Sequence, residues 1–202
     1  LAYKSASPAT KKLILNGYEI IGRYMANGTL IFRDMRKVDS FQKMNAVIRE
    51  SISNGLPNVV FIDAIFNVEM NDKFDANRSE NIARAKLLKK IADDFGIPVI
   101  TSAEVQKEKQ ECDIKEPLGK NAIMESGKFG YNAAYIITAF PIRFSDWNNN
   151  DIERVPIILN IAKNKRSKGK GFRYHWFNRT SGLIEAMRYE EAIEVKESYN
   201  IR

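Results

Sequence analysis

The stretch PNVVFIDAIFN, residues 57–67, decides how the rest of the chain is interpreted. Its run of β-forming residues, Val59–Ile62, ends at an aspartate, Asp63. At the end of a buried strand, an aspartate either starts a turn or presents its carboxylate to a ligand, such as a magnesium ion beside a nucleotide. The neighbouring elements have to decide between these two interpretations.

Apolar residues spaced three and four apart predict a helix on each side of this strand. The first helix starts at Asp39 or Ser40 and ends before Gly55, and the second ends at Gly96. Their predicted apolar faces comprise Phe41, Met44, Val47, Ile48 and Ile52, and then Ile82, Ala85, Leu88, Ile91, Ala92 and Phe95. A further helix is predicted within the first 28 residues.

The remaining apolar runs predict strands. They cover residues 29–34, 58–63, 97–102, 133–140 and 155–162, followed by an antiparallel edge strand over 171–177 and its return over 183–187. The run 97–102 has the composition of a strand buried on both faces, and the charged segment 104–120 predicts a surface loop. This order predicts an α/β fold: a mainly parallel sheet flanked by helices, with antiparallel edge strands at the C-terminus.

The size and composition of the chain suit one folded domain. It has 202 residues, of which 44% are apolar, enough for one substantial core. No apolar stretch approaches the ~20 residues that span a bilayer, so no membrane partner is expected. A single cysteine, Cys112, excludes an internal disulfide, and one histidine, His175, leaves too few ligands for a structural zinc site. A cytoplasmic location is the expectation.

The net charge of +7 comes from one segment. Residues 154–184 contain eight basic residues and no acidic one, which leaves 24 basic against 25 acidic residues elsewhere. The eight are Arg154, Lys163, Lys165, Arg166, Lys168, Lys170, Arg173 and Arg179. Such a local excess predicts a surface that binds polyphosphate or nucleic acid, and the alternative is a solvated loop with surplus lysines.

Polar side chains follow three of the predicted strands. Asp63 follows one, Ser102–Glu104 follow the next, and Lys163–Arg166 follow a third. Sheets of this class bind ligands at the carboxyl ends of their parallel strands. An acid, a polar group and a basic cluster that converge on one sheet edge would suit a magnesium-bound polyphosphate.

Four stretches occur in an order that resembles a known family. They are PNVVFIDAIFNVE (57–69), RSENIARAKLLKKIADDFGIPVITSAE (78–104), MESGKFGYNAAYIITAF (124–140) and IILNIAKNKRSKGKGFRYHWFNRTSGLIE (157–185). Together they resemble the RecA-like motor domain of DnaB-type replicative helicases, over roughly residues 29–185. The resemblance implies a RecA-like P-loop NTPase fold.

The resemblance also implies that ATP and Mg²⁺ bind. Asp63 would hold Mg²⁺ through water, beside the β- and γ-phosphates. Glu104 stands where the family usually has a glutamine that senses the γ-phosphate, and a carboxylate there would be repelled unless protonated or turned away. Lys163 and Lys165 match a Lys-x-Arg pair that reaches the ATP site of a neighbouring subunit. Lysine stands at the arginine position, and Arg166, one residue later, could serve instead.

Contact with single-stranded DNA is a further implication of the resemblance. Glu125, Ser126 and Gly127 match the loop that contacts the DNA backbone in the central channel of the ring. Met124 replaces the family's arginine before this loop, which removes one charge-assisted phosphate contact. Lysines that flank the loop could bind further phosphates. They are Lys107, Lys109 and Lys128.

The family's phosphate-binding loop is absent from the sequence. This loop requires Gly-x-x-x-x-Gly-Lys followed by Ser or Thr, and none of the three Gly-Lys pairs here is followed by either. We interpret residues 1–202 as a single RecA-like motor domain, incomplete at its N-terminus and inactive as an ATPase alone. The intact protein would be a ring helicase, expected to be a hexamer, that uses ATP to move along single-stranded DNA. The alternative is a degenerate, non-hydrolysing module that binds single-stranded DNA or a replication partner.

Overall fold

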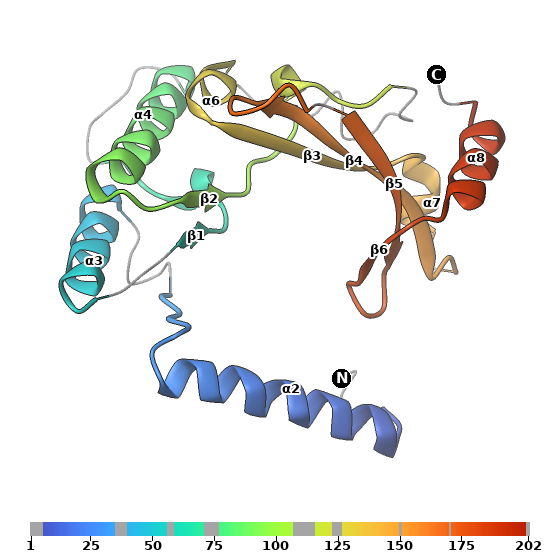
Figure 1. The fold of residues 1–202 in the computed structure, drawn as a ribbon, viewed down its shortest axis with the longest axis horizontal. Helices are drawn as coiled ribbons and strands as arrows, with labels where there is room; N and C mark the ends of the chain where they lie inside the picture. Colours follow the sequence, from blue (N-terminus) through green and yellow to red (C-terminus); the bar gives the residue numbers. More distant parts are fainter. Residues whose placement is uncertain are drawn as a thin grey trace. The chain divides into compact units, whose positions relative to one another are not determined.

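The computed structural model describes residues 6–34, 40–55, 59–70, 77–106, 116–122, 127–149, 151–169 and 171–200. The chain divides into two compact units, Leu1–Asp39 and Ser40–Arg202, whose elements are labelled in Figure 1. None of the described helices is long and apolar enough to cross a membrane. The assignment of residues 1–202 to a single motor domain stays a prediction.

The first unit contains one long helix, α2, Pro8–Ala26. The Ser7 side chain caps its start by accepting a hydrogen bond from the backbone N–H of Thr10 at 3.2 Å. None of the 19 residues of α2 is buried. A helix at this place confirms the prediction for the start of the chain. The strand predicted over 29–34 is wrong, because no described strand offers this segment a hydrogen-bonding partner.

The second unit begins with α3, Phe41–Ser53. The Ser40 side chain accepts a hydrogen bond from the N–H of Lys43 at 3.3 Å, which confirms one of the two predicted caps. The helix is followed by Gly55 at a φ of 81°, a left-handed conformation that glycine adopts without steric cost. The face turned to the core is the predicted one, and its buried residues are Phe41, Met44 and Ile48.

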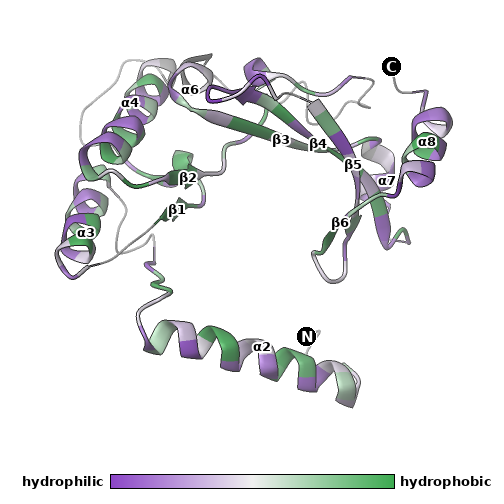
Figure 2. Cartoon of the chain, in the orientation of Figure 1, coloured by the Kyte–Doolittle hydropathy of each residue, from purple (hydrophilic) through white to green (hydrophobic). Residues whose placement is uncertain are grey.

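A parallel pair of short strands, β1 (Val60–Ile62) and β2 (Val99–Thr101), lies on either side of α4 (Asn77–Phe95) in the chain. Figure 2 shows apolar residues along both strands. Only one face is covered, since Ile62 is 6% exposed and Phe61 is 71% exposed. Burial of β2 on both faces is therefore a wrong prediction. Its residues are half-buried or exposed, because the described part of this sheet has two strands and α4 contacts it.

The other described strands form a four-stranded antiparallel sheet in the order β3–β4–β5–β6 (Figure 1). They are β3 (Tyr135–Pro141), β4 (Arg154–Asn164), β5 (Gly171–Asn178) and β6 (Ile184–Ala186). The α/β class is as predicted, but parallel pairing is limited to β1 and β2 among the described strands. The predicted edge position of the strand over 171–177 is wrong, because β5 lies between β4 and its return strand β6.

The core of the antiparallel sheet lies where β3, β4 and the C-terminal helix α8 (Tyr189–Ser198) meet. Its buried residues are Phe140, Ile142, Ile158 and Val195. Tyr174 and Trp176 of β5 pack against this cluster. The sequence pattern predicts neither α8 nor the short helical elements between strands. The short ones are η1 (Ile65–Asn67), η2 (Lys120–Ala122), α6 (Gly127–Asn132) and α7 (Phe144–Asn148).

Candidate functional site

Two polar side chains meet where the parallel strands β1 and β2 end. Asp63 directly follows β1, Ser102 directly follows β2, and the Ser102 hydroxyl donates a hydrogen bond to Oδ1 of Asp63. The strand register causes this meeting: Ile62 pairs with Thr101, and the N–H of Ser102 donates to the carbonyl of Ile62 at 3.2 Å. Both polar side chains are exposed. The structure thus brings Asp63 and Ser102 together at one sheet edge, as the order of the strands predicts.

Burial fixes the segment that follows Asp63. Ile65 and Val68 are both 0% exposed, and the N–H of Ile65 donates to the carbonyl of Ser102 at 3.3 Å. From α4, Nε of Arg84 donates to the carbonyl of Val68 at 3.1 Å. The exposed Asp63–Ser102 pair therefore stands on a support that is packed and hydrogen-bonded from two sides.

Arg84 is a buried cation whose described hydrogen bonds go to α4 and to the residue after η1. Besides Val68, it donates to Oδ1 of Asn81 at 2.8 Å and to Oε1 of Glu80 at 2.6 Å. A buried guanidinium needs such pairing, because an unpaired charge in the protein interior is very costly. Arg84 is not among the residues predicted from the sequence. Its position beside Ala85, on the predicted apolar face of the helix, is the feature that could have revealed it.

The predicted DNA-contact residues lie almost entirely outside the described residues. This holds for Lys107, Lys109, Glu125 and Ser126 and for the side chain of Lys128. Gly127 is the first residue of α6. Glu104 is described and exposed, two residues after Ser102. The roles of all these residues stay predictions.

The basic turn, residues 163–169, follows the pairing of β4 with β3 and is organised by Asn164. Oδ1 of Asn164 accepts hydrogen bonds from the N–H groups of Arg166 at 3.1 Å and Ser167 at 3.2 Å. Its Nδ2 donates to Oγ of Ser167 at 2.7 Å and to the carbonyl of Gly169 at 3.2 Å. An asparagine that bonds the backbone two and three residues ahead defines the turn. Asn164 is also missing from the sequence-based prediction, although an Asn at a strand end before Ser and Gly is a recognised turn pattern.

The exposed cations of the basic turn are set apart from the other basic residues of 154–184. Arg154 is paired with Glu185 at 3.1 Å, and Arg179 donates to the carbonyl of Ile152 at 3.4 Å. The turn itself presents its cations to solvent on a hydrogen-bonded backbone, an arrangement that can bind a polyphosphate. The exposed cations of the turn are Lys165, Arg166 and Lys168.

Lys163 differs from its neighbours because it is half-buried and bonded. Its Nζ donates to the carbonyl of Gly130 and to that of Tyr131, the latter at 3.0 Å. Burial, and then the nearby charges of Lys165 and Lys120, lower the pKa of Lys163 below its usual value. The predicted finger residues are therefore of two kinds, one bonded within the fold and two exposed.

Strand pairing does not bring the basic turn to the edge that holds Asp63 and Ser102. β4 is antiparallel to β3, with Asn164 beside Tyr135, and neither strand belongs to the described sheet of β1 and β2. The prediction that three carboxyl strand ends share one sheet edge is therefore wrong in its third member. The reason is the direction of β4, which a run of apolar residues does not reveal.

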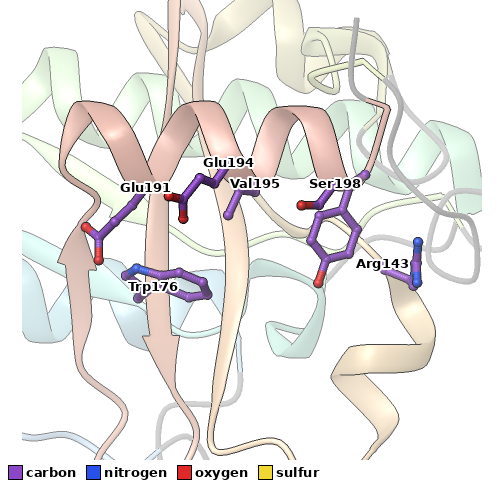
Figure 3. A pocket seen from close by; sticks show the side chains of 7 residues that line it. Arg143, Trp176, Glu191, Glu194, Val195 and Ser198 are labelled. Atoms are coloured by element: carbon purple, nitrogen blue, oxygen red, sulfur yellow. The ribbon is translucent and has the colours of Figure 1, made fainter.

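A cavity of about 480 Å³ lies apart from both groups, between α8 and the antiparallel sheet. Trp176 and Tyr199 line it together with Glu191, Glu194 and Arg143 (Figure 3). The guanidinium carbon of Arg143 lies 4.8 Å from the centre of the Tyr199 ring, within the range of a cation–π contact. The cavity is an open seam of helix packing, with side chains of both charges on its walls.

We expect Tyr199 to ionise unusually late. Its hydroxyl donates to Oδ2 of Asp146 at 2.7 Å. Burial, and then this bond and the charge of Asp146, raise the pKa of Tyr199 from 10.0 to about 12, whereas Arg143 lowers it. The folded chain thus holds this proton more tightly than the unfolded chain does. The resulting stabilisation is complete below pH 10 and is lost as the pH rises through the folded pKa of about 12.

Ultraviolet titration of tyrosinate measures this ionisation directly. A component that ionises near pH 12 should be present in the native chain and absent in Tyr199→Phe. Tyr189→Phe is the matched control, because Tyr189 begins the helix that Tyr199 follows and is 76% exposed. A late component that survives in Tyr199→Phe would assign it to another tyrosine and contradict the prediction.

Comparison with known proteins shows the fold. No family model matches the chain, and no curated protein matches its sequence. Two solved structures, the ATPase domain of a DnaB-like helicase and a DnaB-like replicative helicase studied with its primase interactions, each match 74% of this chain with a TM-score of 0.61 and 19% identity. This chain spans 52% of the first and 35% of the second. It therefore has the RecA-like α/β fold of DnaB-like helicase ATPase domains, as the resemblance implies.

Proposed function

We propose that this chain is part of an ATP-dependent replicative DNA helicase that moves along single-stranded DNA as a ring. The observation that supports this most is the Asp63–Ser102 pair at the ends of two parallel strands, in a fold shared with helicase ATPase domains. Open α/β sheets bind their ligands at this edge, and a strand-end aspartate is the usual companion of a magnesium nucleotide.

Asp63 fits a magnesium ion held through water. Its carboxylate is exposed, and the hydrogen bond from Ser102 leaves other lone pairs for coordinated water. Among the described residues, no group of three or more His, Cys, Asp or Glu side chains could hold a metal ion. Mg²⁺ would therefore take its other ligands from water and from the phosphates of ATP, as it usually does. When bound, it would neutralise charge on the β- and γ-phosphates.

The basic turn would act on a second copy of the chain. It is not paired into the sheet of Asp63 and Ser102, so a role at the nucleotide of a neighbouring subunit suits it better than a role at its own. Lys165 and Arg166 are the exposed candidates for the finger. Such a role requires self-assembly into a ring, which we propose to be a hexamer in the cytoplasm. Single-stranded DNA would contact residues 125–127.

The second candidate function is a RecA-like module that binds single-stranded DNA or a replication partner without hydrolysing ATP. The observation that favours it is chemical: no Gly-Lys pair of the sequence is followed by Ser or Thr, as a phosphate-binding loop requires. Glu104 points the same way, because a carboxylate would repel a γ-phosphate. On either interpretation, we expect little ATP hydrolysis by this chain alone.

The test is single-stranded DNA binding as a function of salt, with and without Mg-ATP, in the native chain and in Asp63→Ala. We expect binding to weaken steeply with salt, because phosphate contacts release counterions. We also expect a response to Mg-ATP that Asp63→Ala abolishes. Asp151→Ala is the matched control, since it removes an exposed carboxylate from the turn before β4.

Each outcome separates the candidates. A nucleotide response that depends on Asp63 and not on Asp151 supports the motor function. DNA binding that ignores both nucleotide and Asp63 supports the non-hydrolysing module. Absence of DNA binding counts against both.

A further inference from the structure

Lys163 makes an unusual contact for a predicted phosphate ligand. Its ammonium group donates to the carbonyls of Gly130 and Tyr131, near the end of α6 (Gly127–Asn132). Carbonyls at the end of a helix lack partners within the helix, and a cation placed there satisfies them and complements the helix dipole. The contact joins residues 33 and 32 positions apart in the chain, so it ties β4 to α6.

α6 is one of two stems that flank residues 123–126. The other stem is η2, and the two stems touch: a Cβ added to Gly130 would lie 3.3 Å from the carbonyl oxygen of Lys120. A side chain at position 130 would therefore push the stems apart, because the atom it meets belongs to the backbone. η2 is held in turn by the N–H of Gln106, which donates to the carbonyl of Ala122 at 2.9 Å.

The other end of the Lys163 contact is the basic turn. Asn164, which organises the turn, is the next residue, and the N–H of Lys165 donates to the carbonyl of Ala134 at 3.0 Å. The segment that leaves α6 and the segment that enters the turn thus run side by side. One lysine anchors both.

We propose that Lys163 is a positioning residue that holds the basic turn and the stem of the 123–126 segment in one fixed arrangement, and is not itself a phosphate ligand. The proposal rests on the proposed function for the roles of its two ends: the DNA-contact loop on α6 and the finger in the basic turn. It replaces the role that the resemblance implies for Lys163. Its donors are engaged by two carbonyls, whereas Lys165 and Arg166 are exposed.

Hydrogen exchange followed by mass spectrometry tests the anchor without requiring DNA binding. In Lys163→Met, exchange of the amides of residues 127–135 should accelerate about tenfold, since hydrogen bonds from a charged group are lost. Lys163→Arg should restore most of the protection, because it keeps a long cationic donor. Lys165→Met is the matched control and should leave these amides unchanged. If Lys163→Met does not fold, Lys163→Gln keeps an N–H donor and should give a smaller acceleration.

Two further measurements separate positioning from mere structural support. Affinity for inorganic tripolyphosphate should be unchanged in Lys163→Met and weakened in Lys165→Met. Bound single-stranded DNA should slow exchange in the basic turn of the native chain and fail to do so in Lys163→Met, since the link between loop and turn is cut.

The outcomes are distinct. Unchanged exchange of residues 127–135 in Lys163→Met overturns the proposal, and so does a loss of tripolyphosphate affinity equal to that of Lys165→Met. DNA-induced protection of the turn that persists in Lys163→Met also overturns it. Failure of the native chain to bind DNA would remove the proposed function, and the exchange and tripolyphosphate measurements would still decide the role of Lys163.

Discussion

Replacing Arg84 with methionine is expected to lower the free energy of unfolding by about 3–5 kcal/mol, the usual cost of removing one partner from a buried ion pair. The change deletes hydrogen bonds to the carbonyl of Val68, to Asn81 and to Glu80. Val68 is 0% and Asn81 2% exposed, so water does not readily replace the lost donors. Urea denaturation followed by circular dichroism measures the difference.

Lys90→Met is the matched control. It makes the same kind of change on the same helix, at a lysine paired with Asp94 at 2.7 Å, but the Lys90 side chain is 66% exposed. An exposed pair four residues apart contributes about 0.5 kcal/mol or less. Equal losses in the two variants would show that the Arg84 network adds nothing beyond a surface ion pair. A large loss confined to Arg84→Met would establish it as the support beneath the segment after Asp63.

The helices of the second unit could be predicted because local patterns determine them. Ser40 caps α3 where a serine precedes apolar residues at helical spacing, and Phe41, Met44 and Ile48 of that pattern are buried. The pattern predicts the face of α4 equally well, since Ala85, Leu88 and Ile91 are buried. Spacing along a helix identifies its buried side without knowledge of what covers it.

The arrangement of the strands could not be predicted in the same way. An apolar run does not reveal the direction of its neighbour, so the sequence suggests parallel strands for β3 and β4, which are antiparallel. The same limit explains the segment 29–34, which has the composition of a strand and no partner among the described strands. Pairing is a property of two segments, and only one is visible in any stretch of sequence.

The candidate site shows both situations. Asp63 and Ser102 each follow a strand, and their meeting needs only that β1 and β2 be neighbours in register. The contact of Lys163 with Gly130 depends on the bulge between Ile136 and Ile137 and on the path of α6, which no motif encodes. Motif matching therefore assigns Lys163 a ligand role, whereas its neighbours in space indicate an anchor.

Neutralising the exposed cations of the basic turn is expected to weaken binding of inorganic tripolyphosphate by about 10- to 100-fold at low salt. The variant is Lys165→Gln, Arg166→Gln and Lys168→Gln combined. Exposed charge pairs contribute about 0.5–1 kcal/mol each, and three of them give this range. The turn backbone should persist, because Asn164, Ser167 and Gly169 supply its hydrogen bonds. Isothermal titration calorimetry measures the affinity.

A variant with the same net charge separates a local site from general attraction. Lys12→Gln, Lys43→Gln and Lys196→Gln combined remove three exposed lysines from three different helices. Equal weakening in this control would show that tripolyphosphate responds only to the net charge, and the basic turn would not be a site. Single-stranded DNA distinguishes the two phosphate sources. Under the finger role, the salt dependence of DNA binding should change little in the basic-turn variant. A slope reduced by about 2 would place the DNA backbone itself on the turn, because each lost phosphate contact on a single strand lowers the slope by about 0.7.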